Sequence, residues 1–172
     1  EKQLHSREAG QRRSGALPRF SNLRVLVAHD SAVNREAAIE ALKHPDATAI
    51  AADDHWLAGP NRQLVTWGAR AYPPLLASIP DPPLVLFVEG DPATLALPQF
   101  AIVGSRHPTS LGRDTAEQFA HHLAEAGLAI TSGLALGIDA AGHRGAQQAG
   151  GRTVAVLGCG LDTIYPREHV SL

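Results

Sequence analysis

Methionine is absent from the sequence, and cysteine occurs once, at Cys159. A single cysteine excludes an intramolecular disulfide and any zinc site built from several thiolates. The lack of a disulfide framework favours a reducing compartment, so we expect a cytoplasmic protein. The chain begins at Glu1 rather than at methionine, and we expect it to be part of a longer gene product.

Long apolar runs and a large excess of charge are also absent. No segment approaches the roughly 20 apolar residues that a transmembrane helix needs. The polar, basic N-terminus does not resemble a signal peptide, and no membrane insertion is predicted. The net charge of -2 argues against a protein that coats nucleic acid with a broad basic surface. Any site for an anionic ligand must therefore be local.

Aromatic residues are scarce, at 5% of the 172 residues, whereas hydrophobic residues reach 44% and are sufficient for a folded core. Many proteins that bind single-stranded nucleic acid stack its bases on aromatic rings. Phe100 and Phe119 are expected in the core, so stacking is not the predicted basis of binding in this chain.

The first third of the chain is predicted to contain two regions. Residues 1–22 are polar and rich in Arg, Ser and Gly, which indicates a flexible basic tail. Residues 23–60 are predicted to form a small α/β or helical segment, with a buried strand at 23–28 and a helix at about 33–43.

Residues 61–172 are predicted to form one Rossmann-like domain of the α/β class, with a parallel sheet and helices on both faces. Prolines between 52 and 99 exclude long helices in that stretch and leave room for a short strand at 84–88. From residue 100 onward, short apolar strands alternate with amphipathic helices, which is typical of βαβ units. The expected strands are 100–103, 128–131 and 153–157, and the expected helices are 110–125 and 138–149.

Each of the last three predicted strands is followed by a turn that contains glycine. These turns are Gly104-Ser105-Arg106, then Ser132-Gly133 with Gly137 four residues further on, and finally Gly158-Cys159-Gly160. The carboxyl ends of parallel strands lie along one edge of the sheet, and open α/β sheets bind their ligands at that edge. We therefore expect the three turns to lie side by side.

The residue types in these turns favour an anionic ligand. Glycine lets backbone N–H groups approach a ligand closely, and the helices starting at Ser110 and Ile138 are expected to add free N–H groups and partial positive charge. Ser105 and Ser132 supply hydroxyl donors, and the guanidinium of Arg106 is suited to phosphate. A phosphate or a phosphodiester backbone is the predicted ligand. No segment reads G-x-G-x-x-G or G-x-x-x-x-G-K-[ST], so neither the usual NAD site nor a P-loop is predicted.

Several other polar residues are assigned structural roles. Asp139 and His143 are four residues apart on one predicted helix, where Asp139 is expected to complement the helix N-terminus and His143 to pack beside it. His121 and His122 point about 100° apart on a helix and are not expected to bind a metal together. Cys159 has no base at a recognisable spacing and is not predicted to be a nucleophile. No catalytic residue, metal or cofactor is predicted.

Residues 23–42, LRVLVAHDSAVNREAAIEAL, resemble the opening of a response-regulator receiver domain. A receiver needs an acidic pair after this strand, where the chain has His29-Asp30, and a phosphoacceptor aspartate after a later strand. No segment supplies the second requirement, so a working receiver is not predicted.

Four blocks of the chain resemble the DprA/Smf family of DNA-processing proteins. They are YPPLLASIPDPPLVLFVEGD (72–91), AIVGSR (101–106), TSGLALGIDAAGHRGA (131–146) and GGRTVAVLGCGLDTIYP (150–166). The resemblance implies an extended Rossmann fold that binds single-stranded DNA without catalysis and delivers it to the RecA recombinase during natural transformation. It also implies a homodimer in the full-length protein, and a sheet that is C-terminally truncated in this chain.

The resemblance also assigns roles to individual residues. Gly104, Ser105 and Arg106 would form a first phosphate-binding turn, with Ser132, Gly133 and Gly137 in a second and Gly158 and Gly160 in a third. Arg167 falls where the family tends to place a basic DNA contact. The alternative is a nucleotide-binding or nucleotide-processing enzyme on a related Rossmann-like scaffold, such as the lysine-decarboxylase-like phosphoribohydrolases. Those enzymes have a catalytic glutamate near a glycine-rich loop, and Glu168 is the only acid after Asp162 here.

Overall fold

The computed structural model describes the backbone of residues 25–28, and residues 43–162 together with Pro166 in full. The predicted basic tail at 1–22, nearly all of the helix predicted at about 33–43, and Arg167 lie outside these residues.

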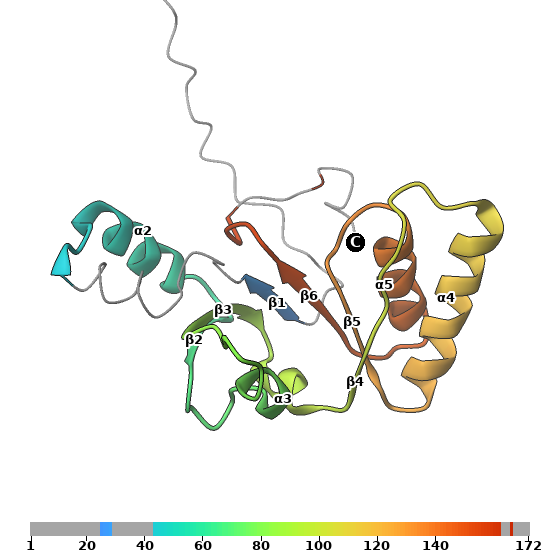
Figure 1. The fold of residues 1–172 in the computed structure, drawn as a ribbon, viewed down its shortest axis with the longest axis horizontal. Helices are drawn as coiled ribbons and strands as arrows, with labels where there is room; N and C mark the ends of the chain where they lie inside the picture. The colour runs from blue at the N-terminus through green and yellow to red at the C-terminus, as the bar shows by residue number, and fades with distance from the viewer. Residues whose placement is uncertain (1–24, 29–42, 163–165, 167–172) are drawn as a thin grey trace, which may run out of the picture.

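A six-stranded sheet runs through the described part of the chain (Figure 1). Its spatial order is β2 (Arg62–Thr66), β3 (Val85–Gly90), β1 (Val25–Ala28), β6 (Thr153–Leu157), β5 (Ala129–Ser132) and β4 (Gln99–Ala101). Strands β1, β6, β5 and β4 are parallel neighbours, whereas β3 is antiparallel to both β1 and β2. The parallel part confirms the predicted Rossmann-like sheet, and the antiparallel pair extends it.

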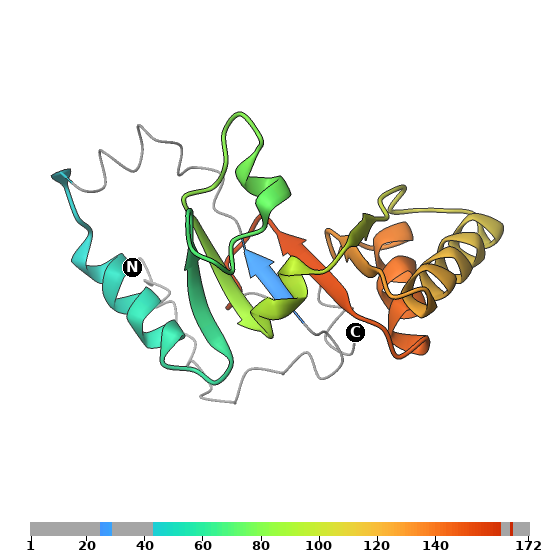
Figure 2. The same ribbon diagram turned by 90° about the horizontal axis from the view of Figure 1, so that it is seen from below.

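The main helices lie at the two ends of the sheet (Figure 2). Helices α4 (Ser110–Glu125) and α5 (Ile138–Gln148) lie near β4 and β5, and α2 (Ala47–Leu57) lies near β2. Helix α5 packs on β5 and β6, and Trp56 of α2 contacts Phe87 of β3 edge to face with ring centroids 5.7 Å apart. Phe87 and Leu157 both pair with Ala28 of β1 in the strand register, so they lie on the same face of the sheet. Trp56 of α2 contacts Phe87, and Ala140 of α5 packs with Leu157, so α2 and α5 cover that same face.

Short helical segments cover the opposite face. These are α3 (Pro74–Ala77) and the 3-10 helix η1 (Pro92–Ala96). Leu95 of η1 packs with Leu86, Val88 and Val154, and Leu76 of α3 packs against the same cluster. With helices on both faces, the predicted fold class is confirmed.

Helix α2 was not predicted as an element of its own, although it lies within the segment 23–60, which was expected to be α/β or helical. It spans 11 residues because Pro45 and Pro60 fall outside both of its ends. Asp46 caps it, since its carboxylate accepts hydrogen bonds from the backbone N–H groups of Thr48 at 2.9 Å and Ala49 at 3.2 Å.

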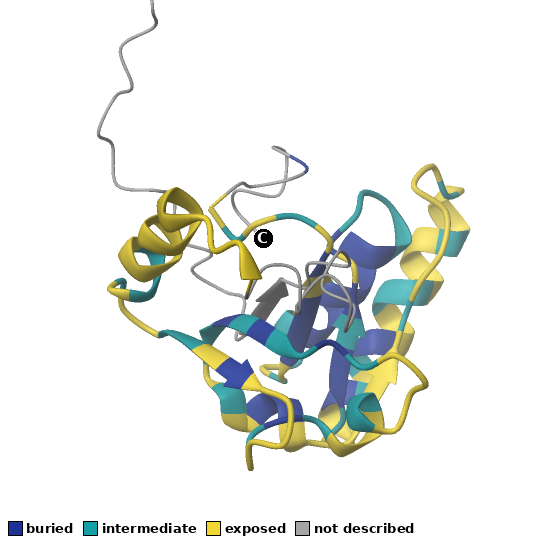
Figure 3. Cartoon of the chain, turned by 60° about the vertical axis from the view of Figure 1, so that its left-hand side comes forward, coloured by how far each residue is buried: buried dark blue, intermediate teal, exposed yellow. Residues whose placement is uncertain are grey.

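A close approach of α4 and α5 depends on a glycine. A Cβ atom at Gly145 would overlap the backbone carbonyl of Glu117 on α4, so a larger residue there would separate the helices. The interface is filled by small side chains, and Ala120 and Ala146 are both fully buried against Ile130. Figure 3 shows the result: α5 is largely buried, while much of α4 is exposed.

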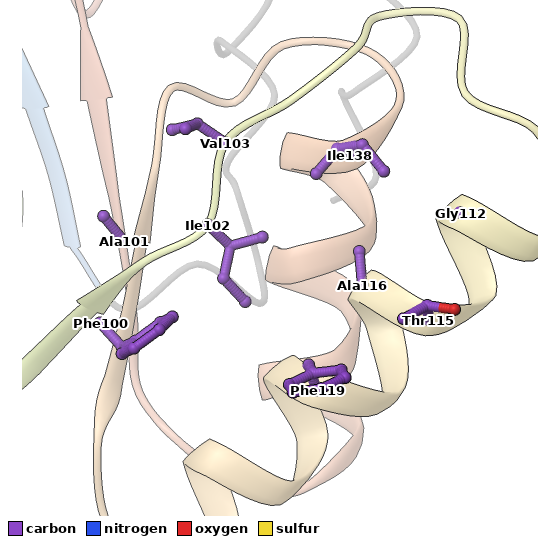
Figure 4. A pocket seen from close by; sticks show the side chains of 9 residues that line it. All are labelled: Phe100, Ala101, Ile102, Val103, Gly112, Thr115, Ala116, Phe119 and Ile138. Carbon is purple, nitrogen blue, oxygen red and sulfur yellow. The ribbon is translucent and has the colours of Figure 1, made fainter.

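The outer side of α4 and the edge strand β4 differ from the sequence prediction. Phe100 and Phe119, expected in the core, are 48% and 62% exposed. Both line an open apolar pocket of about 400 Å³ between β4, α4 and the start of α5 (Figure 4). Periodicity predicted an apolar face for α4 but not which of its residues contact a neighbour. Among the described strands, β4 pairs with β5 alone.

Candidate functional site

The first two glycine turns are joined by backbone contacts. The backbone N–H of Ile138, the first residue of α5, donates a hydrogen bond to the carbonyl oxygen of Ser105 at 3.1 Å. Gly137 has a positive φ of 82°, and a Cβ atom there would overlap that oxygen and come within 2.8 Å of the carbonyl carbon of Arg106. Only glycine allows this approach, so the turn at 104–106 is fixed against the start of α5.

The second and third turns meet through apolar side chains. Leu134, fully buried, belongs to a cluster with Ala140, Ala155 and Leu157, and Cys159 of the third turn packs against that cluster. Leu134 also adopts a positive φ of 57°, which is unusual for a leucine and occurs here at a fully buried, packed position. The three turns therefore lie side by side at the carboxyl edge of β4, β5 and β6.

A buried carboxylate holds the second turn from below. Asp139, 7% exposed, accepts hydrogen bonds on Oδ2 from the backbone N–H groups of Gly133 at 3.1 Å and Ala135 at 3.3 Å. These two N–H groups therefore face a carboxylate of the protein itself rather than a ligand. Asp139 was expected to complement its own helix terminus, and sequence alone did not indicate this reach back to the preceding loop.

The two serines have different surroundings. Ser132 is 3% exposed, and its hydroxyl donates to the carbonyl oxygen of Ile102 at 2.6 Å, which ties the end of β5 to the segment after β4. Ser105 is exposed, and its Oγ accepts a hydrogen bond from the backbone N–H of His107 at 3.1 Å. A hydroxyl that accepts this bond still has a hydrogen to donate, so Ser105 alone of the pair can offer one to a ligand.

Arg106 is the exposed cation of the first turn, and it forms no ion pair with the residues of 43–162. Nearby arginines on the helices already face carboxylates, with Arg113 at 3.9 Å from Asp114 and Arg144 at 3.8 Å from Glu117. Gly104, Gly158 and Gly160 are also exposed, whereas Arg167 lies outside the described residues. Among the described residues of the three turns, Arg106 is therefore the one cationic side chain.

One of the N–H groups expected to be free at the start of α5 is not available to a ligand, because the N–H of Ile138 donates to the carbonyl oxygen of Ser105. At the start of α4, Thr109 caps the helix by accepting from the N–H of Gly112 at 3.1 Å. In the first turn of each helix, one backbone N–H group therefore donates to an acceptor of the protein itself. Contacts to an anion would depend more on Arg106 and Ser105 than the sequence suggested.

The core behind the turns contains a polar pair. His143 is fully buried, and its Nδ1 lies 2.6 Å from Oγ1 of Thr153. The Thr153 hydroxyl donates its only hydrogen to the carbonyl of Ile130 at 2.8 Å, so Nδ1 of His143 must be the donor to Thr153. This places His143 in the packing between α5 and the sheet, as the sequence predicted.

Across the described ranges, a single group of side chains could hold a metal ion, and it lies on α4 at the end opposite to the glycine turns: His121, His122 and Glu125. A hydrogen bond from His122 and the charge of His121 lower the pKa of Glu125 below its usual value, so this carboxylate is ionised. Within the part of the chain that the structure describes, no helix has both the length and the apolar character needed to cross a membrane.

An open α/β sheet with joined loops at the carboxyl ends of its parallel strands places the chain among the Rossmann-like domains, which bind ligands at this edge. Comparison of the sequence with models of protein families identifies the family within this class of domains. The family model of DNA recombination-mediator protein A matches residues 63–172, and the chain belongs to that family.

Curated relatives agree with this assignment. Protein Smf of Escherichia coli (strain K12) is 45% identical over 117 residues, which is 68% of this chain and 31% of that protein. The DNA processing protein DprA of Streptococcus pneumoniae is 45% identical over 101 residues, 59% of this chain and 36% of that protein. The chain thus spans about a third of the length of these relatives.

Solved structures of the family have the same fold. DNA processing protein A (DprA) from Streptococcus pneumoniae superposes with a TM-score of 0.65 at 34% identity, over 79% of this chain and 46% of that one. A structure of DNA processing protein A from Helicobacter pylori, described for its single-stranded DNA binding mode, gives a TM-score of 0.55 at 33% identity, over 63% of this chain and 48% of that one.

Proposed function

We propose that this chain binds single-stranded DNA through its sugar–phosphate backbone at the carboxyl edge of β4, β5 and β6, and that it does so without catalysis. The observation that carries the proposal is the turn at 104–106. It is fixed against Gly137 and presents the exposed guanidinium of Arg106 beside the exposed hydroxyl of Ser105. A rigid turn that presents a forked cationic donor is suited to a phosphate group.

The predicted site residues take two kinds of role in this proposal. Arg106 and Ser105 contact phosphate oxygens, and the exposed backbone at Gly104, Gly158 and Gly160 lets a strand of DNA lie close to the sheet edge. Ser132, Gly133 and Gly137 hold the turns in position through the contacts already described. Arg167 is proposed as a further basic contact on the basis of the family resemblance.

The low net charge is compatible with this proposal. One local cation contributes to binding, and the shape of the site and contacts from the protein backbone supply the rest. Family membership supports a DNA ligand, as does the single-stranded DNA binding mode described for the Helicobacter pylori relative. Delivery of the DNA to the RecA recombinase during natural transformation, homodimerisation and a cytoplasmic location are proposed for the whole protein on the same family grounds.

Fluorescence anisotropy of a labelled oligothymidine, titrated with the 172-residue chain, tests the proposal. Binding is expected to weaken as salt rises from about 50 to 200 mM, with a slope of about 0.7 per phosphate neutralised. Double-stranded DNA of the same length and free mononucleotides serve as competitors. Folded protein that binds no oligonucleotide at low salt would overturn the proposal. Thermal stabilisation by a mononucleotide alone would support the alternative, a nucleotide-processing enzyme.

A further inference from the structure

The last turn of α4 presents two imidazoles to one carboxylate. Nδ1 of His121 lies 3.4 Å and Nδ1 of His122 lies 3.3 Å from the same oxygen, Oε2 of Glu125. The two rings are edge to face with centroids 5.7 Å apart. These two histidines were not expected from the sequence to bind a metal together, but both rings converge on one carboxylate oxygen.

The helix geometry explains the convergence. With about 100° between successive residues, Glu125 lies about 40° around the helix from His121 and about 60° from His122. It stands between the two histidines and one turn further along, so both can reach it as i,i+4 and i,i+3 partners. The preference for side chains at these spacings to meet depends only on α-helical geometry, which α4 maintains from Ser110 to Glu125.

We propose that His121, His122 and Glu125 form a binding site for a divalent transition metal of the zinc type. Two imidazoles and a carboxylate form a ligand set that suits Zn²⁺, with a water molecule in the fourth position. One ligand atom from each of the three residues lies within 4.8 Å of the other two.

The distances fit four-coordinate geometry. Tetrahedral zinc with bonds of about 2.0–2.1 Å separates its ligand atoms by about 3.3–3.4 Å. The two measured separations between imidazole nitrogen and carboxylate oxygen are 3.3 and 3.4 Å. The ligand atoms of the three residues lie within 4.8 Å of one another, and a rotation of His122, whose side chain is 78% exposed, would bring the two imidazoles to the separation that zinc requires.

The site is separate from the glycine turns. Helix α4 begins at Ser110, next to the turn at 104–106, and a rise of about 1.5 Å per residue places His121 roughly 16 Å further along its axis. Zinc binding at this site therefore does not depend on the proposed DNA edge, and the two proposals can fail independently.

Zinc affinity of the untagged, metal-stripped 172-residue chain is measured by competition with a chromophoric chelator, without DNA. We expect saturable binding, and we expect the zinc affinity to fall at least about tenfold in His121→Ala, His122→Ala and Glu125→Gln. A loss of about tenfold is the smaller effect seen when only the residues that support a metal ligand are changed. The matched control is His55→Ala, an exposed histidine in the last turn of α2, which should bind zinc like the parent. Circular dichroism establishes that each variant is folded.

Two measurements on the unsubstituted protein make the outcome independent of variant folding. Zn²⁺ should shift the imidazole NMR signals of His121 and His122 and leave those of His55 unchanged. Co²⁺ at the site should give the intense visible absorption of a four-coordinate ion. The proposal is overturned if Zn²⁺ shifts the imidazole signals of neither His121 nor His122, or if His121→Ala and His55→Ala bind zinc with equal affinity.

Discussion

Gly137 and Ser105 are in backbone contact, although 31 residues, which include helix α4 and strand β5, separate them in sequence. The carbonyl oxygen of Ser105 accepts the N–H of Ile138 at 3.1 Å and occupies the position that a Cβ atom of residue 137 would need. This contact joins the loop between β4 and α4 to the start of α5. It also holds the exposed turn at 104–106 against the start of α5.

Gly137→Ala is expected to destabilise the protein by at least about 2 kcal/mol. The alanine would combine an unfavourable positive φ with a steric overlap at the Ser105 carbonyl, and each of these effects costs about 1–3 kcal/mol. Urea unfolding gives the change in free energy. Gly150→Ala is the control, since Gly150 also has a positive φ, of 66°, but no atom near its missing Cβ. Equal losses for both variants would show that the contact with Ser105 is unimportant.

Removal of the Asp139 carboxylate should loosen the second turn in a graded way. Asp139→Asn keeps an oxygen acceptor for the N–H groups of Gly133 and Ala135, whereas Asp139→Ala leaves both N–H groups without it. We expect a loss of about 1 kcal/mol for the asparagine and about 3 kcal/mol for the alanine. Hydrogen exchange of the Gly133 and Ala135 amides should accelerate in the same order. An alanine variant with unchanged exchange would contradict the role assigned to Asp139.

Phe119→Ala should cost less than about 1 kcal/mol, although a buried phenylalanine loses about 3–5 kcal/mol on the same substitution. The reason is that Phe119 is 62% exposed at the open pocket beside β4. Ile130→Ala, at a fully buried position on β5, provides the contrast and should cost about 2–5 kcal/mol. Similar losses for the two variants in urea unfolding would place Phe119 in the core after all.

Periodicity and turn chemistry predicted the regular part of the fold well. Helix α4 and strand β6 have the predicted bounds. Thr109 caps the start of α4, and the glycine pair at 150–151 comes shortly before the start of β6. The antiparallel β2 and the helix α2 were not predicted, because short apolar segments between prolines look alike whether they form strands, helices or loops. The exposure of Phe100 was also missed, since its strand β4 pairs with only one of the strands that the structure describes.

At the candidate site, sequence reasoning identified the loops but not their internal bonding. Parallel strands dictate that the three turns share an edge, which is why their proximity could be predicted. The hydrogen bond from Ser132 to Ile102 and the two accepted by Asp139 link residues whose separation in sequence gives no signal. Those bonds change the expected division of roles, because they leave Arg106 and Ser105 as the side chains of the first two turns that can contact a ligand.

The binding of single-stranded DNA by Arg106→Ala, compared with Arg152→Ala, tests the account most directly. Both arginines are exposed and both changes remove one positive charge, but Arg152 precedes β6 and lies at the opposite edge of the sheet, where it pairs with Asp91 at 3.3 Å. Arg106→Ala should weaken anisotropy-measured affinity about tenfold or more, because a charged hydrogen bond contributes about 1.5–3 kcal/mol. It should also lower the salt slope by about 0.7. Arg152→Ala should bind like the parent, and equal affinities for the two variants would contradict a DNA site at the glycine turns.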